Sequence, residues 1–345
     1  MQICAAPHIE ERTLLERAPH EAEIETIEVR HGHFWIPGER VDTPYGTMQK
    51  GPMFVEWQAP RAVTRPYPLI LVHGGGGQGT DWLGTPDGRR GWADRFVREG
   101  FATYVVDRPG HGRSPHHPDV LGAPGAQTPY QAVNFLFAGV DAVETQTQWP
   151  WRRDIGGPEL DQLTAGLGFL LADVAESQRL DGDRLASLLD IVGPAVLVTH
   201  SAGAPGGWLA ANRRPGLVKA IVAVEPMGPP FADMPGFCRL DWGLTGARIT
   251  YDPPVEDPAS IAGGIQGHRI VGLTGTPVMV LTGSASGAAA FGPPVVDFLN
   301  EAGARAELVA LADRGITGNG HGLIFEANSE ETIVPVIEWI TTNVT

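Results

Sequence analysis

The stretch AVLVTHSAGA, residues 195–204, carries the strongest structural signal in the chain. Its first six residues, AVLVTH, begin with four apolar residues, which is typical of a strand buried on both faces of a parallel sheet. Ser201 follows this strand directly, and we expect a helix over 203–212. A serine on a sharp strand-to-helix turn presents its hydroxyl above the sheet edge, and the next backbone N–H, from Ala202, can point at a developing oxyanion. Ser201 is therefore the candidate nucleophile.

The turn around Ser201 departs from the usual G-x-S-x-G pattern, because Thr199 stands where the first glycine is expected. Small flanking residues let such a turn close without side-chain clashes, and threonine is bulkier than glycine. A serine at this place can also be a simple helix cap. The buried strand before Ser201 and Gly203 after it favour the catalytic interpretation.

Apolar runs alternate with helical patterns along the rest of the chain. IETIEV (24–29) and MFVEWQ (53–58) alternate in the manner of an opening antiparallel pair of strands. The order strand, helix, strand predicts an α/β fold with a doubly wound, mostly parallel sheet. Further expected strands are 68–73, 102–107, 218–225, 276–283 and 305–311, and expected helices are 91–99, 159–178, 183–192, 293–302 and 330–341.

We expect an N-terminal arm over residues 1–23 and one domain over 24–345. Two connections within it, at about 108–158 and 226–275, are too long for simple crossovers and should form inserted lid or cap loops. Aromatic residues are expected to wall a substrate pocket there, which predicts an apolar or aromatic neutral substrate. The expected pocket residues are Trp82, Phe135, Phe137, Trp149 and Trp151.

A second motif, LILVHGGGGQG, places His73 and the four glycines Gly74, Gly75, Gly76 and Gly77 directly after a strand. Loops of this HGGG type supply backbone N–H groups to an oxyanion hole, because glycine lets the backbone approach the substrate closely. Glycine-rich turns also bind phosphate. The lysine and the downstream acidic residue of the phosphate-binding motifs are missing, so the oxyanion role is favoured, with His73 bracing the loop.

The base and the acid are sought in chain order after the nucleophile. His321 lies in GNGHG, after the last expected strand and before the final helix, and it is the candidate base. No acid follows the strand 276–283, where one is common. Glu225 ends the preceding strand and is the candidate acid, with Asp233 and Asp297 as alternatives.

Composition limits the partners of the chain. Its 25 Lys and Arg against 40 Asp and Glu give a formal net charge of −15, which would repel nucleic acid. Two cysteines exclude a disulfide framework, and their spacing does not suggest a zinc site. His31 and His33 have a metal-like spacing, but no carboxylate-rich partner is evident, so we expect no metal site. There is no run of 18 apolar residues and no signal-peptide pattern at the N-terminus, so we expect no membrane contact and a cytoplasmic location.

Together, the glycine loop, Ser201, Glu225 and His321 resemble the α/β-hydrolase superfamily over roughly residues 50–345. Within it, the chain looks like a group of bacterial serine esterases with a Ser-Glu-His triad, in which the Glu follows the sixth strand. The turn D-R-P-G-H-G-R-S over 107–114 also resembles a turn of these enzymes. The resemblance implies an enzyme without a cofactor that acts on a small molecule and is often a homodimer.

These residues predict hydrolysis of a carboxylic ester through an acyl-enzyme. The same triad could instead hydrolyse a carbon–carbon bond or open a lactone. A lyase or a non-catalytic binding protein on the same scaffold is the third alternative, and it would form no acyl-enzyme.

Overall fold

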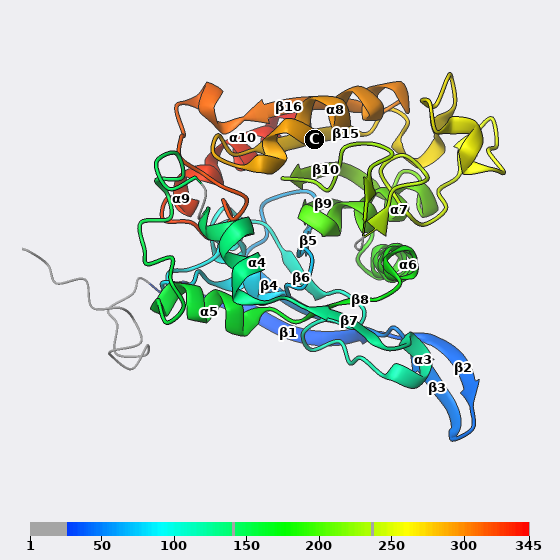
Figure 1. The fold of residues 1–345 in the computed structure, drawn as a ribbon, viewed down its shortest axis with the longest axis horizontal. Coiled ribbons are helices and arrows are strands. Elements are labelled where there is room, and N and C mark those ends of the chain that lie inside the picture. Colours follow the sequence, from blue (N-terminus) through cyan, green and yellow to red (C-terminus); the bar gives the residue numbers. More distant parts are fainter. Residues whose placement is uncertain (1–25, 140–141, 236–237, 345) are drawn as a thin grey trace, which may run out of the picture.

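The computed structural model describes residues 26–139, 142–235 and 238–344, so the expected arm over 1–23 lies outside the described residues. A central eight-stranded sheet organises the chain (Figure 1). Strand β4 is antiparallel to β1 and to β6, and every later neighbouring pair is parallel. In spatial order the strands are β1 (Val29–Ile36), β4 (Met53–Pro60), β6 (Thr103–Asp107), β5 (Leu69–Val72), β9 (Ala195–His200), β10 (Val218–Val224), β15 (Pro277–Thr282) and β16 (Arg305–Ala310).

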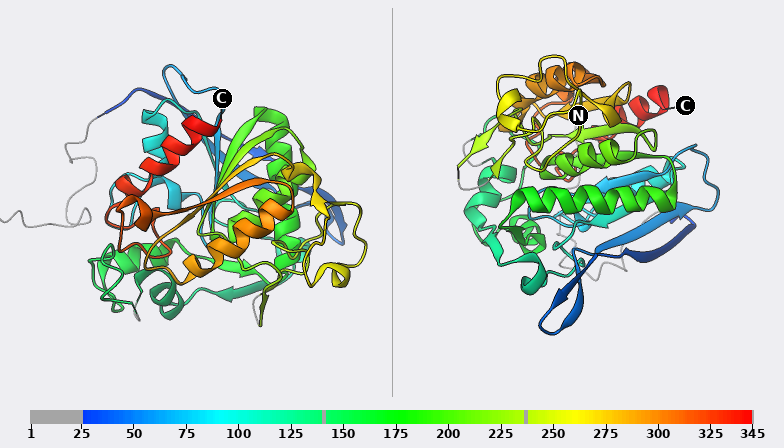
Figure 2. Two further views of the ribbon diagram at one scale, coloured as in Figure 1. Left: turned by 90° about the horizontal axis from the view of Figure 1, so that it is seen from above. Right: turned by 90° about the vertical axis from the view of Figure 1, so that its right-hand side faces the viewer.

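Helices cover both faces of the sheet, which confirms the predicted doubly wound α/β class (Figure 2). Successive strand residues point to opposite faces, so each buried strand contributes to two cores. Ile70 and Val72 pack into one core, and Leu69 and Leu71 pack into the other. The first core includes α6 (Val174–Val192), α7 (Ala204–Arg213) and α8 (Gly292–Glu301), and the second includes α2 (Trp92–Arg98) and α10 (Val334–Asn343).

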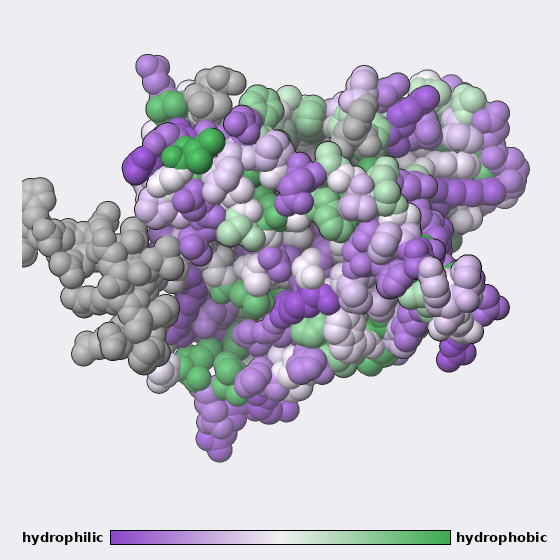
Figure 3. Space-filling view, turned by 60° about the horizontal axis from the view of Figure 1, so that its bottom comes forward, coloured by the Kyte–Doolittle hydropathy of each residue, from purple (hydrophilic) through white to green (hydrophobic). Residues whose placement is uncertain are grey.

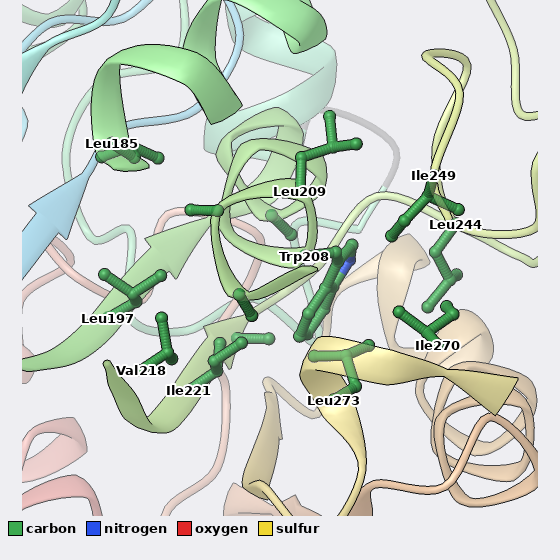
Figure 4. Packing of buried hydrophobic residues seen from close by; sticks show 14 of the residues in the cluster. Leu185, Leu197, Trp208, Leu209, Val218, Ile221, Leu244, Ile249, Ile270 and Leu273 are labelled. Carbon is green, nitrogen blue, oxygen red and sulfur yellow. The ribbon is translucent and has the colours of Figure 1, made fainter. Parts of the chain in front are cut away.

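Trp208 on α7 joins the sheet to the insertion that follows β10. Its indole is buried in the same core as Leu197 and Ile221 of the sheet. Figure 4 shows it facing Leu244 and Ile249 of the insertion. This large aromatic side chain packs between the sheet and the insertion, and the packing fixes the position of α7, the helix that begins just after Ser201.

The first strand lies farther along the chain than IETIEV predicts. Residues 26–28 are not in a strand, and β1 pairs with β4 over its whole length, from Val29 opposite Pro60 to Ile36 opposite Met53. Of the strand expected over 24–29, residues 24 and 25 lie outside the described residues and only Val29 belongs to β1, because VRHGHFWI is the segment that pairs with β4. The turn-rich segment between the two strands forms a hairpin of β2 (Glu39–Thr43) and β3 (Gly46–Lys50).

The helix expected over 159–178 is helical at both ends but interrupted in the middle. Helix α5 (Pro158–Gly166) ends at the GLG sequence, β8 (Phe169–Leu171) follows, and α6 then runs unbroken through the helix expected at 183–192. The new start comes from Asp173, whose side chain accepts a hydrogen bond of 2.9 Å from Glu176 N and caps α6. The last expected helix is split into α9 (Ser329–Thr332) and α10.

Short elements occupy the two long connections. The connection at 108–158 contains α3 (Pro118–Leu121), β7 (Pro124–Gln127), α4 (Tyr130–Val133) and the π-helical turn η3 (Asn134–Ala138), and β7 pairs with β8. The connection at 226–275 contains β11 (Asp233–Met234), β12 (Cys238–Arg239), β13 (Tyr251–Asp252), β14 (Arg269–Ile270) and the 3₁₀ turns η5 (Pro258–Ile261) and η6 (Val271–Leu273). The remaining short turns are α1 (Thr80–Leu83), η4 (Ser201–Gly203), η7 (Gly287–Phe291) and η8 (Leu311–Arg314).

The face turned forward in Figure 3 is mostly hydrophilic, with apolar residues in small separate groups. Within the described ranges, no helix has the length and apolar character needed to cross a bilayer.

Candidate active site

Ser201 occupies a sharp turn between β9 and α7. Its φ is +50°, a left-handed conformation that costs energy for any residue other than glycine and is often found at functional sites. Gly203 makes the turn possible, because a Cβ there would lie 2.4 Å from the carbonyl oxygen of His73. Thr199 is fully buried and fits because α7 carries Gly207, whose added Cβ would lie 3.0 Å from Thr199 Cγ2.

Three side chains from distant parts of the chain form one hydrogen-bonded series. The Ser201 hydroxyl lies 2.9 Å from His321 Nε2, and His321 Nδ1 lies 3.2 Å from Glu225 Oε2. A carboxylate only accepts, so His321 donates from Nδ1 and its Nε2 accepts from the Ser201 hydroxyl. The structure thus brings together the nucleophile, base and acid that the sequence predicts, with the histidine in the tautomer that general-base chemistry requires.

Glu225 is fully buried, and its two oxygens are held by donors from the segment that follows β15. Gly283 N donates to Oε1 at 2.6 Å, and Ser286 Oγ donates to Oε2 at 2.5 Å. The alternatives Asp233 and Asp297 are exposed, and neither has a recorded contact with His321. The sequence pattern did not identify Ser286, although SASG stands where an acid is common, and here the serine supports an acid from the neighbouring strand.

His321 is fixed from two further sides. His200 donates from Nε2 to the main-chain oxygen of His321 at 2.9 Å, and burial lowers the pKa of His200 to about 3, so its ring stays neutral. The ring of Phe137 stacks on that of His321, with centroids 5.7 Å apart. His200 therefore supports the segment that carries His321.

A buried carboxyl group anchors the loop that carries His321. Glu326 accepts hydrogen bonds from Gln146 Nε2 at 2.6 Å, Asn319 Nδ2 at 2.8 Å and Gly320 N at 2.9 Å. Burial raises the pKa of Glu326 to about 7, and the hydrogen bonds offset only part of that effect. Gln146 belongs to the insertion after β6, so this contact ties the insertion to the histidine loop. No local sequence pattern indicates a role for either residue.

Two of the four loop glycines face Ser201. A Cβ on Gly74 would lie 3.2 Å from Ser201 Cβ, and one on Gly75 would lie 3.4 Å from Ala202 Cβ. Gly74, Gly75 and Ala202 line the same cavity as Ser201. Gly76 and Gly77 do not line it, contrary to their expected oxyanion role. Gly76 has φ +67° and turns the chain toward Thr128, and Gly77 packs against Asp81.

The cavity above Ser201 has a volume of about 780 Å³, within the usual range for a small-molecule site. Phe135 and Phe137 line it, as predicted. Trp82, Trp149 and Trp151 do not, and placing them in the pocket was wrong. Trp82 and Trp149 are buried in the second core and Trp151 is partly buried against it, and Trp82 contacts Trp92 while Trp149 contacts Trp151. Apolar lining residues missed by the sequence analysis include Ala132, Leu163, Leu167, Leu170, Met227, Met234 and Phe291.

Comparison with known proteins agrees with this architecture. A family model described as "alpha/beta hydrolase fold" matches residues 67–244, just over half of the chain. A probable secreted lipase, PhiG, from Fungal sp. (strain ATCC 74256) is 34% identical over 321 residues, which cover 86% of this chain and 87% of the relative. The name of that relative does not fit the cytoplasmic location expected above, which stays a prediction.

The structure of a novel bacterial esterase superposes with a TM-score of 0.67 and 21% identity, and the match covers 93% of this chain and 98% of the other. At this identity the likeness concerns the fold. The family match and the lipase-like relative, together with the strand order and the turn at Ser201, show that the chain belongs to the α/β-hydrolase fold family.

Proposed function

We propose that this protein is a carboxylic ester hydrolase that works through an acyl-enzyme on Ser201. One observation carries the proposal: the hydrogen-bonded series from Ser201 through His321 to Glu225 opens into an apolar cavity beside a glycine loop. The lipase-like relative supports ester hydrolysis in general.

The reaction follows from these positions. His321 takes the proton of Ser201 through Nε2, and the serine oxygen attacks the ester carbonyl. The backbone N–H groups of Gly75 and Ala202 stabilise the negative oxygen of the tetrahedral intermediate. His321 then passes its proton to the leaving alkoxide, and a water activated by the same nitrogen releases the acid. Glu225 holds the tautomer of His321 and stabilises the imidazolium that forms.

The cavity lining favours a neutral ester with an apolar or aromatic acyl or alcohol group. Most of the residues around it are aliphatic or aromatic, and among the residues that the structure describes no Lys or Arg lines it. An anionic substrate would lose its hydration without gaining a charged partner, which is costly. We therefore expect uncharged esters to be hydrolysed much faster than esters that carry a carboxylate.

A fluorophosphonate probe tests the nucleophile directly. We expect one adduct on the peptide that contains Ser201, and we expect no labelling of Ser201→Ala or His321→Ala. A folded protein that is not labelled and does not hydrolyse 4-nitrophenyl esters would contradict the proposal and favour a lyase or a binding protein. A panel of lactones and carbon–carbon substrates, measured beside the esters, decides which bond is cleaved.

A further inference from the structure

A buried charged pair lies behind the glycine loop. Arg108 follows β6, and its side chain is 4% exposed, while that of Asp181 on α6 is fully buried. Arg108 donates to Asp181 Oδ2 from Nε at 2.9 Å and from Nη2 at 2.7 Å. Its remaining terminal nitrogen, Nη1, donates to the carbonyl oxygen of Gly74 at 3.1 Å. The pair therefore aims one guanidinium N–H at a single carbonyl of the loop.

His73 supplies a second donor to the same oxygen. The backbone N–H of Arg108 donates to His73 Nε2 at 3.0 Å, so this nitrogen carries no proton. The proton is then on Nδ1, which lies 2.9 Å from Gly74 O and donates to it. Burial, together with the charge of Arg108, holds the pKa of His73 well below its usual value, so the ring stays neutral.

These two donors determine where the next N–H points. The Gly74–Gly75 peptide is trans, so the N–H of Gly75 points opposite to the C=O of Gly74. The carbonyl faces Arg108 and His73, and the loop lies against Ser201 and Ala202. In the described part of the chain, Gly75 N–H has no recorded acceptor. It is available to a ligand oxygen in the cavity.

The loop needs such a constraint because its residues have no side chains. Peptides between glycines rotate more easily than others, since no Cβ restricts φ and ψ. A flip of this peptide would present a carbonyl oxygen where an oxyanion must bind, which replaces attraction by repulsion. Farther along, Gly76 O accepts from Gly168 N at 2.7 Å, so the loop is held on both sides of Gly75.

We propose that Arg108, held by Asp181, is a positioning residue that keeps the Gly75 N–H directed into the oxyanion hole. Arg108 does not line the cavity and acts only through the carbonyl of Gly74. The inference rests on the proposed ester hydrolysis, since it concerns the same oxyanion hole. It predicts an effect on the transition state and little effect on substrate binding.

Two variants and one control test this role. Arg108→Lys keeps a charge beside Asp181 but loses the fork that reaches two acceptors at once. Arg108→Met combined with Asp181→Leu removes both charges and leaves neither buried alone. The control is Arg184→Met, because Arg184 is also a buried arginine that donates to a backbone carbonyl, that of Gly51 at 2.8 Å, and neither of these two residues lines the cavity.

The measurements are kcat and KM for a neutral 4-nitrophenyl ester and the inhibition constant of a phenylboronic acid, which forms a tetrahedral adduct on an active-site serine. We expect both Arg108 variants to lose about ten- to hundredfold in kcat with KM within about twofold. The affinity for the boronic acid should fall by the same factor as kcat. The control variant should match the wild type in kcat and in this affinity.

Folded Arg108 variants with wild-type kcat and boronic acid affinity would overturn the inference. So would a loss that appears only in KM, or an equal loss in the control. If the double variant does not fold, Arg108→Lys alone decides by the same criteria. A wild-type protein that neither hydrolyses esters nor reacts with fluorophosphonate would show instead that the proposed function fails, which is a distinguishable result.

Discussion

Glu225 stands beside Ser201 at the same position on the neighbouring strand. His200 and Val224 are partners in the parallel register of β9 and β10, and each strand is followed by a residue with a left-handed backbone, φ +50° at Ser201 and +49° at Glu225. The two residues thus leave adjacent strand ends with the same kind of bend. This arrangement lets a carboxylate from β10 reach the histidine that contacts the serine.

Removal of the Glu225 charge should therefore lower kcat sharply. In Glu225→Gln, the charge that stabilises the imidazolium is lost and one acceptor oxygen becomes an NH2 donor, so the tautomer of His321 is no longer fixed. We expect kcat to fall by about two to four orders of magnitude. Ser286→Ala removes one donor but keeps the carboxylate, so it should cost only about tenfold or less. Steady-state kinetics on a neutral ester measures both. Equal losses in the two variants would contradict the role assigned to the charge.

The close packing of α7 against β9 at the turn that carries Ser201 predicts an effect on stability. A methyl group at Gly207 would lie 3.0 Å from Thr199 Cγ2, so Gly207→Ala should lower the free energy of unfolding by about 1–3 kcal/mol. Thr199→Ala removes the opposing methyl, and the double variant should recover part of that loss. A urea-unfolding double-mutant cycle measures the coupling. If the effects of the two single substitutions on the unfolding free energy were additive, α7 would have moved away from β9 and relieved the contact.

Much of the site could be predicted because its reactive residues lie in short, local sequence patterns. An apolar run followed by Ser-Ala-Gly, a run of glycines after a strand and a histidine between glycines each point to one role. Glu225 could be placed by elimination, since the segment after β15 offers no acid. The strand order then brings these residues to one edge of the sheet.

The parts that could not be predicted depend on packing between distant segments. No local pattern tells that Trp149 fills a core while Phe137 faces His321, since both lie in the same aromatic-rich insertion. The contact of Gln146 with Glu326 joins residues 180 positions apart. The start of β1 was misplaced because IETIEV alternates as well as the segment that actually pairs with β4.

The raised pKa of Glu326 predicts that the free energy of unfolding depends on pH. Its pKa is raised from 4.5 to about 7 in the folded protein, so the folded state binds a proton more tightly than the unfolded chain does. This contribution is complete below about pH 4.5 and is lost as the pH rises through about 7. The unfolding free energy of the wild type should fall over that interval relative to Glu326→Gln, which has no titrating group at this position. Urea unfolding at several pH values measures the difference, and parallel curves for the two proteins would contradict it.

The shape of the cavity predicts a change in chain-length preference. Ala132 lines the cavity from the end of α4, near Phe135, and its side chain is partly buried. Ala132→Trp should fill part of the 780 Å³ and lower kcat/KM for long acyl chains while leaving acetyl and butyryl esters within about twofold. The matched control is Ala312→Trp, since Ala312 is exposed in η8 and does not line the cavity. A series of 4-nitrophenyl esters from two to twelve carbons, roughly the span that a cavity of this class encloses, gives the profile. A uniform loss over the whole series would show that position 132 acts on the fold of the insertion and not on the space available to the acyl chain.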